Sequence, residues 1–221
     1  MKIIAHIHND FPTSFGLPRQ SGLSKALIST IVFEPEYRVK EAFRGLEDYS
    51  HLWLLWEFSD AKQDDWSPTV RPPRLGGNTR MGVFATRSPY RPNPIGLSSV
   101  KLESIAFTNE YGPVLLVSGA DMHDNTPLYD IKPYLPYTDS HPEALGGFST
   151  NVFHKNLVVQ CDNALLSPFS EEQKKTLLSV LEQDPRPSYQ NDPDRIYGFT
   201  FAGHEVHFKV IDTTLFVTEI D

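Results

Sequence analysis

The chain has 221 residues and a formal net charge of −8, with 28 acidic and 20 basic side chains. Hydrophobic residues make up 39% of it and charged residues 22%, a composition typical of globular proteins with one large domain or two small ones. This acidity excludes a protein that covers nucleic acid with a broad basic face, and a single cysteine excludes an internal disulfide or a cysteine metal cluster. Since no run of 18 apolar residues and no signal-peptide pattern occurs, we expect a cytoplasmic protein without a membrane partner.

Short strands dominate the first part of the chain. Alternating or continuous apolar residues predict strands over residues 2–8, 26–33, 50–58, 81–85, 98–107 and 113–120. The two tryptophans of residues 50–58 are expected in the core. A short helix is expected from Pro35 to a stop at Gly45. Because no long helix separates these strands, we predict a mainly β protein whose residues 1–140 form a small antiparallel β-barrel.

The composition changes after Tyr137, and residues 138–151 are polar and read as a domain border. Ser170 to Gln173 form a capping box that opens a helix, which Asp184-Pro185 ends. Strands are then predicted over residues 197–201, 205–211 and 215–220. Residues 141–221 should therefore form a small α+β domain.

The spacing of the histidines and of the single cysteine does not predict a metal site. His6 and His8 should share one strand face, but no third ligand follows at a suitable distance. His204 and His207 do not share a face, and Cys161 reads as a small buried residue within a strand. We predict that no metal is bound.

Residues 71–99 contain a local concentration of positive charge. No Asp or Glu occurs from Trp66 to Leu102, and five arginines lie in this window: Arg71, Arg74, Arg80, Arg87 and Arg91. Its second half, RSPYRPNPIGLS, is stiff and poor in N–H donors, which argues against a helix or a central strand. This segment is either a proline-rich connector or a preformed surface for a carboxylate or phosphate.

A second segment, DMHDNTPLYDIKPYLPY at residues 121–137, has turn chemistry in its Asp-Asn-Thr-Pro string. Together the two segments resemble the signatures of the TsaA-like family of tRNA methyltransferases, at Thr86–Ser98 and Asp124–Tyr134. Tyr129 stands where the family carries a leucine. The resemblance extends to residues 16–23, 71–78 and 184–189, so it covers nearly the whole chain.

This resemblance implies methyl transfer from S-adenosylmethionine to the exocyclic nitrogen of threonylcarbamoyl-adenosine, next to the anticodon of threonine tRNA. It also implies a β-barrel, a small C-terminal domain and a homodimer with the cofactor near its interface. The cofactor residues implied are Pro18, Arg19, Gln20, Ser59, Asp60, Arg87, Leu97, Asp124, Asn125, Thr126 and Pro127. Related sequences carry a His-Gln pair at the positions of Ser59 and Asp60, so the role of these two is open.

The candidate substrate residues are Arg71, Arg74, Arg80, Arg91, Asn93, Lys132 and Tyr134, with Arg91 and Asn93 suited to either cofactor or RNA. Arg186 and Arg195 read more readily as structural clamps than as RNA contacts. Methyl transfer depends mainly on positioning, so a nucleophile triad is not required. Asp124 and Asp130 are the candidates to accept the proton, although Asp130 and Lys132 could simply pair with each other.

The absence of a GxGxxG motif before a helix argues against a Rossmann-type methyltransferase, and no P-loop is present. The alternative function is a barrel that binds RNA or a metabolite in the same pocket without catalysis.

Overall fold

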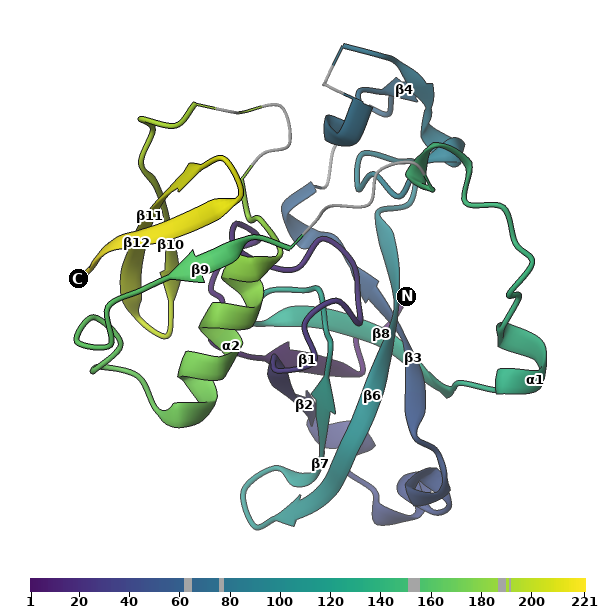
Figure 1. Cartoon of the computed structure of the whole chain (residues 1–221). Coiled ribbons are helices and arrows are strands. Elements are labelled where there is room, and N and C mark those ends of the chain that lie inside the picture. Colours follow the sequence, from purple (N-terminus) through teal and green to yellow (C-terminus); the bar gives the residue numbers. More distant parts are fainter. Residues whose placement is uncertain (62–64, 76–77, 151–155, 187–189, 191) are drawn as a thin grey trace.

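Figure 1 shows the computed structural model of the chain, which describes all residues except 62–64, 76–77, 151–155, 187–189 and 191. Parts of two segments that carry the family resemblance, residues 76–77 and 187–189, therefore lie outside the described residues. The last residue of the predicted border, Asn151, does so too. Within the described residues, no helix has the length and apolar character needed to cross a membrane.

Six antiparallel strands close into a barrel in the order β1-β2-β7-β6-β3-β8, which confirms the predicted fold class (Figure 1). Their bounds are β1 Ala5–His8, β2 Ile28–Phe33, β3 His51–Glu57, β6 Ile95–Thr108, β7 Gly112–Ser118 and β8 Thr126–Pro133. Alternate side chains point inward, and Ile7, Ile31, Leu54 and Leu115 are fully buried in the barrel core. Closure pairs the edges of the sheet and thereby protects them.

Among the barrel strands, β8 is the one that the sequence patterns did not reveal. Pro127 and Pro133 lack the N–H groups of a strand ladder and favour a turn, yet β8 pairs with both β1 and β3. The prediction that the RSPYRPNPIGLS segment excludes a strand was also wrong at its end, because β6 begins at Ile95. Both proline-rich segments therefore lead directly into barrel strands.

The predicted helix after Pro35 was wrong. The segment forms three separate 3-10 turns, Pro35–Tyr37, Lys40–Phe43 and Leu46–Asp48. Phe43 is the only buried residue of these turns and packs edge-on against Phe33, so the segment has no apolar stripe that would hold an α-helix on the barrel.

Two further strand predictions need correction. Trp56 is buried as expected, whereas Trp53 faces outward and donates a hydrogen bond to the Asp139 carboxylate at 2.7 Å. The two tryptophans lie an odd number of residues apart, so the pleat of β3 turns them to opposite faces. The strand predicted at residues 81–85 is shorter: β5, Met81–Gly82, pairs with β4, Thr69–Val70, and a 3-10 turn follows at Val83–Ala85. Other short 3-10 turns lie at Ser59–Ala61, Pro73–Leu75 and Gly147–Ser149.

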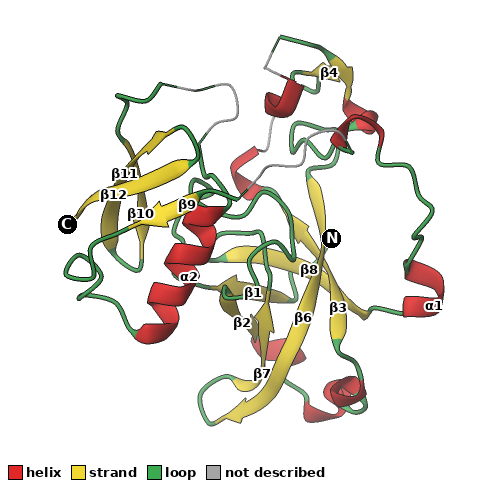
Figure 2. Ribbon diagram, viewed as in Figure 1, coloured by secondary structure: helices red, strands yellow, loops and turns green. Residues whose placement is uncertain are grey.

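In its described residues, the C-terminal part contains the helix α2 and a four-stranded sheet, which Figure 2 shows beside each other. After the short helix α1, Pro136–Asp139, the elements are β9 Val158–Gln160, α2 Glu171–Glu182, β10 Tyr197–Phe201, β11 His204–Ile211 and β12 Thr214–Ile220. The predicted capping box is present: the Ser170 hydroxyl accepts from the Gln173 N–H, and the Gln173 side chain accepts from the Ser170 N–H. Cys161 is only partly buried, and this burial raises the pKa of its thiol.

The loop between β1 and β2 packs into the C-terminal core. Phe11, Leu17 and Leu27 belong to the same buried cluster as α2 and strands β10 to β12. The Ala202 N–H donates to the Asp10 carbonyl at 2.8 Å. Because both ends of this loop are fixed, the Pro18-Arg19-Gln20 segment is held at the junction between the barrel and the C-terminal part.

Candidate functional site

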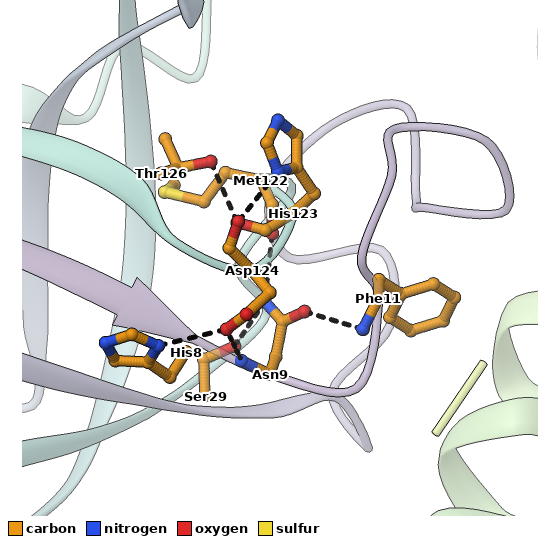
Figure 3. Close-up of polar contacts among 8 residues, drawn as sticks. All are labelled: His8, Asn9, Phe11, Ser29, Met122, His123, Asp124 and Thr126. Carbon is orange, nitrogen blue, oxygen red and sulfur yellow. Dashed lines mark hydrogen bonds and ion pairs between the residues drawn. The ribbon is translucent and has the colours of Figure 1, made fainter. Parts of the chain in front are cut away.

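One group of polar side chains gathers where β1 ends and the turn before β8 begins (Figure 3). The Asp124 carboxylate lies 3.0 Å from His8 Nδ1 and accepts the backbone N–H of Asn9 at 3.2 Å. The Asn125 N–H donates to the Ile7 carbonyl, and Asn125 has a φ of 61°, a left-handed conformation that asparagine tolerates. The turn is thus fixed against β1, with Asp124 at its surface.

His123 connects this turn to a residue from the far end of β3. Its Nε2 atom lies 2.9 Å from the Asp60 carboxylate, and its Nδ1 atom lies 2.8 Å from the Asp124 carbonyl oxygen. Asp60, which the resemblance implied with an open role, therefore contacts this turn through the His123 ring.

A second group lies beside the Pro18-Arg19-Gln20 segment. Arg87 donates through its guanidinium to the Gln20 side-chain oxygen at 2.5 Å, and the Gln20 amide donates to the Arg19 carbonyl at 2.6 Å. Pro18 is buried, while Arg87 is exposed. Gln20 and Arg87, which the resemblance assigned to the cofactor, are thus brought together from positions 67 residues apart.

Arg19 is directed toward the C-terminal part. Its guanidinium donates to the backbone carbonyls of Asp184, at 3.4 Å, and Arg186. Arg186 is itself buried and donates two hydrogen bonds, of 2.8 and 2.9 Å, to the Asp184 carboxylate. This contact agrees with the structural role expected for Arg186. Arg195 lies over the Tyr197 ring at 5.3 Å, also within the C-terminal part. Arg19 therefore links the candidate site to the C-terminal domain.

Asp121 is a site candidate that the sequence did not single out. Its carboxylate accepts a 2.5 Å hydrogen bond from Ser98, whose oxygen in turn accepts from the Trp56 indole at 2.9 Å. Burial raises the pKa of the Asp121 carboxyl, although the Ser98 hydrogen bond, backbone N–H groups including that of Ser21, and the Arg87 charge oppose this shift. Asp121 thus lies beneath the loop that carries Gln20 and next to Arg87.

Three assigned residues lie on a different surface. Leu97 on β6 and Asp130 on β8 both pair with Leu55 of β3, and their side chains share the outer face of the barrel wall with Lys132. Leu97 is 55% exposed and lines a depression of about 330 Å³ together with Trp53 and Lys132. The structure therefore separates this outer-face surface from the group formed by Gln20 and Arg87.

Several residues on or just after β8 make local contacts near this outer face. Lys132 and Asp130 form an ion pair at 2.8 Å, as the simpler interpretation of these residues predicted. Tyr134 packs against Trp53 with ring centroids 5.5 Å apart. Tyr129, at the position where the family carries a leucine, donates a hydrogen bond to Glu57, and burial with this contact raises its pKa to about 12.

The remaining candidates for RNA contact lie on loops. Arg71 and Asn93 are exposed, and Arg80 donates to the Thr69 hydroxyl at 2.9 Å. Arg91 donates to the Thr86 carbonyl at 3.2 Å. The backbone of Arg74 lies in a 3-10 turn, but its side chain is outside what the structure describes.

Among the described residues, one group has potential metal ligands close together: His207, Glu219 and Asp221, with ligand atoms within 4.8 Å of one another. His207 lies on β11, Glu219 lies on β12 and Asp221 follows β12, and two of the three are exposed. Exposed acidic groups commonly gather without an ion, so we assign no metal to them.

The elevated pKa of Asp121 predicts an unusual pH dependence. A carboxyl whose pKa is higher in the folded than in the unfolded protein favours folding while protonated, and this contribution is lost as the pH rises through the folded pKa. The parent should therefore lose stability relative to Asp121→Asn from about pH 4 upward, by about 1.4 kcal/mol for each unit of pKa elevation. Urea denaturation of both proteins at pH 4, 5, 6 and 7 measures this difference; a difference independent of pH would contradict the assignment.

Comparisons with known proteins match these features along the chain. The family model of the tRNA-methyltransferase O N-terminal domain matches residues 6–140, and that of the TrmO C-terminal domain matches residues 153–221. A tRNA (adenine(37)-N6)-methyltransferase of Escherichia coli K12 is 38% identical over 95% of this chain and 92% of its own length. A Pyrococcus abyssi protein, named as a probable S-adenosyl-L-methionine-binding protein, is 34% identical over 69% of this chain and 77% of its own.

The fold agrees with these matches. The crystal structure of TrmO from Pseudomonas aeruginosa superposes with a TM-score of 0.77 at 31% identity, over 99% of this chain and 97% of that chain. The family inferred from the Thr86–Ser98 and Asp124–Tyr134 segments is thereby confirmed. This chain belongs to the TrmO family of S-adenosylmethionine-dependent tRNA methyltransferases.

Proposed function

We propose that this protein transfers the methyl group of S-adenosylmethionine to N6 of adenine 37 in tRNA. We further propose that the adenine is threonylcarbamoyl-adenosine in threonine tRNA. The first statement is supported by the name of the Escherichia coli relative and by family matches to both parts of the chain. The finer one is supported by the signature segments at Thr86–Ser98 and Asp124–Tyr134.

The observation that carries the proposal is the contact between Gln20 and Arg87 beside Asp121, three residues before Asp124 in the chain. S-adenosylmethionine has a carboxylate, an ammonium group and a positively charged sulfur. The Arg87 guanidinium suits the carboxylate, and the carboxylates of Asp60 and Asp124 suit the positive groups. The donors and acceptors therefore fit the cofactor, which when bound supplies the methyl carbon as an electrophile.

Adenine N6 must lose a proton as it forms its bond to the methyl carbon, while the electron pair of the broken bond stays on sulfur. Asp124 suits the acceptor role because its carboxylate is at the surface of the turn and contacts the exposed His8 ring, which can pass a proton to solvent. Asp130 is less suited, because it pairs with Lys132 on the outer face of the barrel. Holding these groups in place is the main catalytic contribution expected of the protein.

The outer-face surface around Leu97 supports a homodimer. Trp53, Leu55 and Leu97 expose apolar atoms around the depression there, and a second copy would cover them. In such a dimer Leu97 would contact the cofactor of the second copy, which reconciles its implied role with its distance from the group of Gln20 and Arg87.

Methyl transfer is tested directly with labelled S-adenosylmethionine and threonine tRNA prepared with or without its threonylcarbamoyl group. We expect N6-methylated product, identified by mass spectrometry of nucleosides, only with the carbamoylated tRNA, and the same yield with EDTA present. Methylation of unmodified adenosine would support the methyltransferase activity but contradict threonylcarbamoyl-adenosine as the required substrate. Binding of both ligands without transfer would favour the non-catalytic alternative, and loss of activity in EDTA that zinc restores would show a metal requirement.

The exposed arginines make a separate prediction about RNA affinity. If Arg71, Arg74 and Arg80 contact phosphates, each change to alanine should weaken tRNA binding and reduce the slope of log affinity against log salt by about one unit. Affinity for S-adenosylmethionine should be unchanged. Fluorescence anisotropy of labelled tRNA at several salt concentrations measures the slope. If the slopes equal that of the parent, these arginines do not dock the RNA, and the C-terminal domain around Arg195 becomes the next surface to test.

A further inference from the structure

Two large aromatic rings lie together on the surface of the β4–β5 hairpin. Trp66 and Phe84 stack with ring centroids 6.1 Å apart and an angle of 29° between their planes. Their exposed fractions are 52% and 74%, and neither belongs to the two buried clusters found among the described residues. The pair is thus formed within the chain but leaves a wide aromatic surface in contact with solvent.

The hairpin explains why these rings meet. Thr69 pairs with Gly82, and beyond this pair the Val83 N–H donates to the Pro68 carbonyl at 3.0 Å. The two segments that flank the strands therefore run side by side. Val83 is buried and fixes the following 3-10 turn, while the next residue, Phe84, projects outward to Trp66. Figure 1 shows β4 at an extremity of the molecule, away from both cores.

The surroundings of the pair are positively charged. The stretch from Trp66 to Leu102 contains no Asp or Glu, although the whole chain carries a net charge of −8. Arg80 is held on the same hairpin by its hydrogen bond to Thr69, and the exposed Arg71 directly follows β4. Asp65, just before Trp66, borders this stretch. An exposed aromatic surface beside exposed guanidinium groups combines the two features with which proteins hold unpaired nucleic acid strands.

We propose that the Trp66–Phe84 pair is a platform on which an unpaired base of the substrate RNA loop stacks. The inference rests on the proposed function in taking tRNA as the partner, and it adds a contact with base rather than phosphate. Charge favours RNA over a second copy of this chain, because a twofold interface centred on the pair would bring the same arginines face to face. A base offers both an aromatic face and a neighbouring phosphate of opposite charge.

The test compares Trp66→Ala and Phe84→Ala with the conservative Trp66→Phe, which keeps an aromatic face. Binding is measured by anisotropy with an anticodon stem-loop and with a blunt duplex of equal length. We expect each alanine substitution to lower the affinity for the stem-loop by roughly 5- to 100-fold. The affinity for the duplex and the dependence of log affinity on log salt should be unchanged. Trp66→Phe should retain most of the affinity. Because both rings are exposed, the melting temperature should hardly change.

Other outcomes would overturn the proposal: parent-like stem-loop affinity in the alanine variants, or an equal loss on duplex and stem-loop. If sedimentation showed that Trp66→Ala converts a dimer to a monomer, the pair would be a contact between copies. Failure of the proposed function is distinguishable. If the parent binds the stem-loop through Trp66 but transfers no methyl group, the platform stands and the proposed function fails. If the parent transfers the methyl group and Trp66→Ala has the same KM for tRNA as the parent, the platform is excluded and the function stands.

Discussion

Replacement of Arg87 by alanine is expected to weaken the binding of S-adenosylmethionine by roughly 10- to 150-fold while the protein stays folded. Arg87 is exposed and donates to the Gln20 side chain at 2.5 Å, beside the partly buried Asp121 carboxylate. The substitution removes a charged hydrogen-bond donor, a change that costs on the order of 1.5 to 3 kcal/mol, but it removes no core volume. Isothermal titration calorimetry with the cofactor measures the loss.

Two comparisons sharpen this result. Arg80→Ala removes another exposed arginine, whose contact is with Thr69, and should leave cofactor affinity unchanged. Because Gln20 and Arg87 contact each other, the double variant should lose less affinity than the sum of the single losses. Parent-like affinity in a folded Arg87→Ala protein would remove Arg87 from the cofactor site.

The barrel could be predicted largely from sequence because its strands are short segments of alternating or continuous apolar residues. The burial of β1 and β2 alternates along the strand, whereas β3 and β7 are nearly continuous apolar runs. β8 could not be found this way, because Pro127 and Pro133 signal a turn and only the partners β1 and β3 supply the pairing. The segment after Pro35 was misread because local helix signals do not show whether a core lies beside it.

The candidate site was predictable only where a motif identified it. Gln20, Arg87 and Asp124 lie in segments that resemble a known family, and the structure places each among polar partners. Asp121 has no such local signal. Its environment depends on Ser98 and on the backbone of Ser21, and these contacts exist only after the barrel has closed.

The C-terminal domain supports the candidate site through the loop between β1 and β2. Gly16, two residues before Pro18, is buried against the Phe199 ring of β10, and its φ is 96°. A Cβ atom at this position would lie 2.6 Å from the ring, which real Cβ contacts essentially never show. Phe199 is itself buried and stacks near Phe11, so it has little room to move.

Gly16→Ala is therefore expected to lower the free energy of unfolding by about 2 to 5 kcal/mol. The left-handed conformation costs an L-residue about 1 to 2 kcal/mol, and the overlap with Phe199 adds an overpacking cost of about 1 to 3 kcal/mol. The matched control is Gly22→Ala in the same loop, where φ is 79° but no atom lies within 4 Å of the added Cβ. This control should show only the conformational cost, so urea denaturation of the two variants separates the two contributions.

The functional consequence of Gly16→Ala follows from the position of the loop. Displacement of Phe199 or of the chain at Gly16 should shift the segment that carries Gln20, and cofactor affinity should fall even at temperatures where the variant remains folded. Gly22→Ala should change affinity less. Combining Gly16→Ala with Phe199→Leu, which makes space for the new methyl group, should restore part of the loss in stability, since the overlap is relieved and the strained φ remains. Equal destabilisation by Gly16→Ala and Gly22→Ala, with no recovery in the double variant, would show that contact with Phe199 does not hold this loop in place.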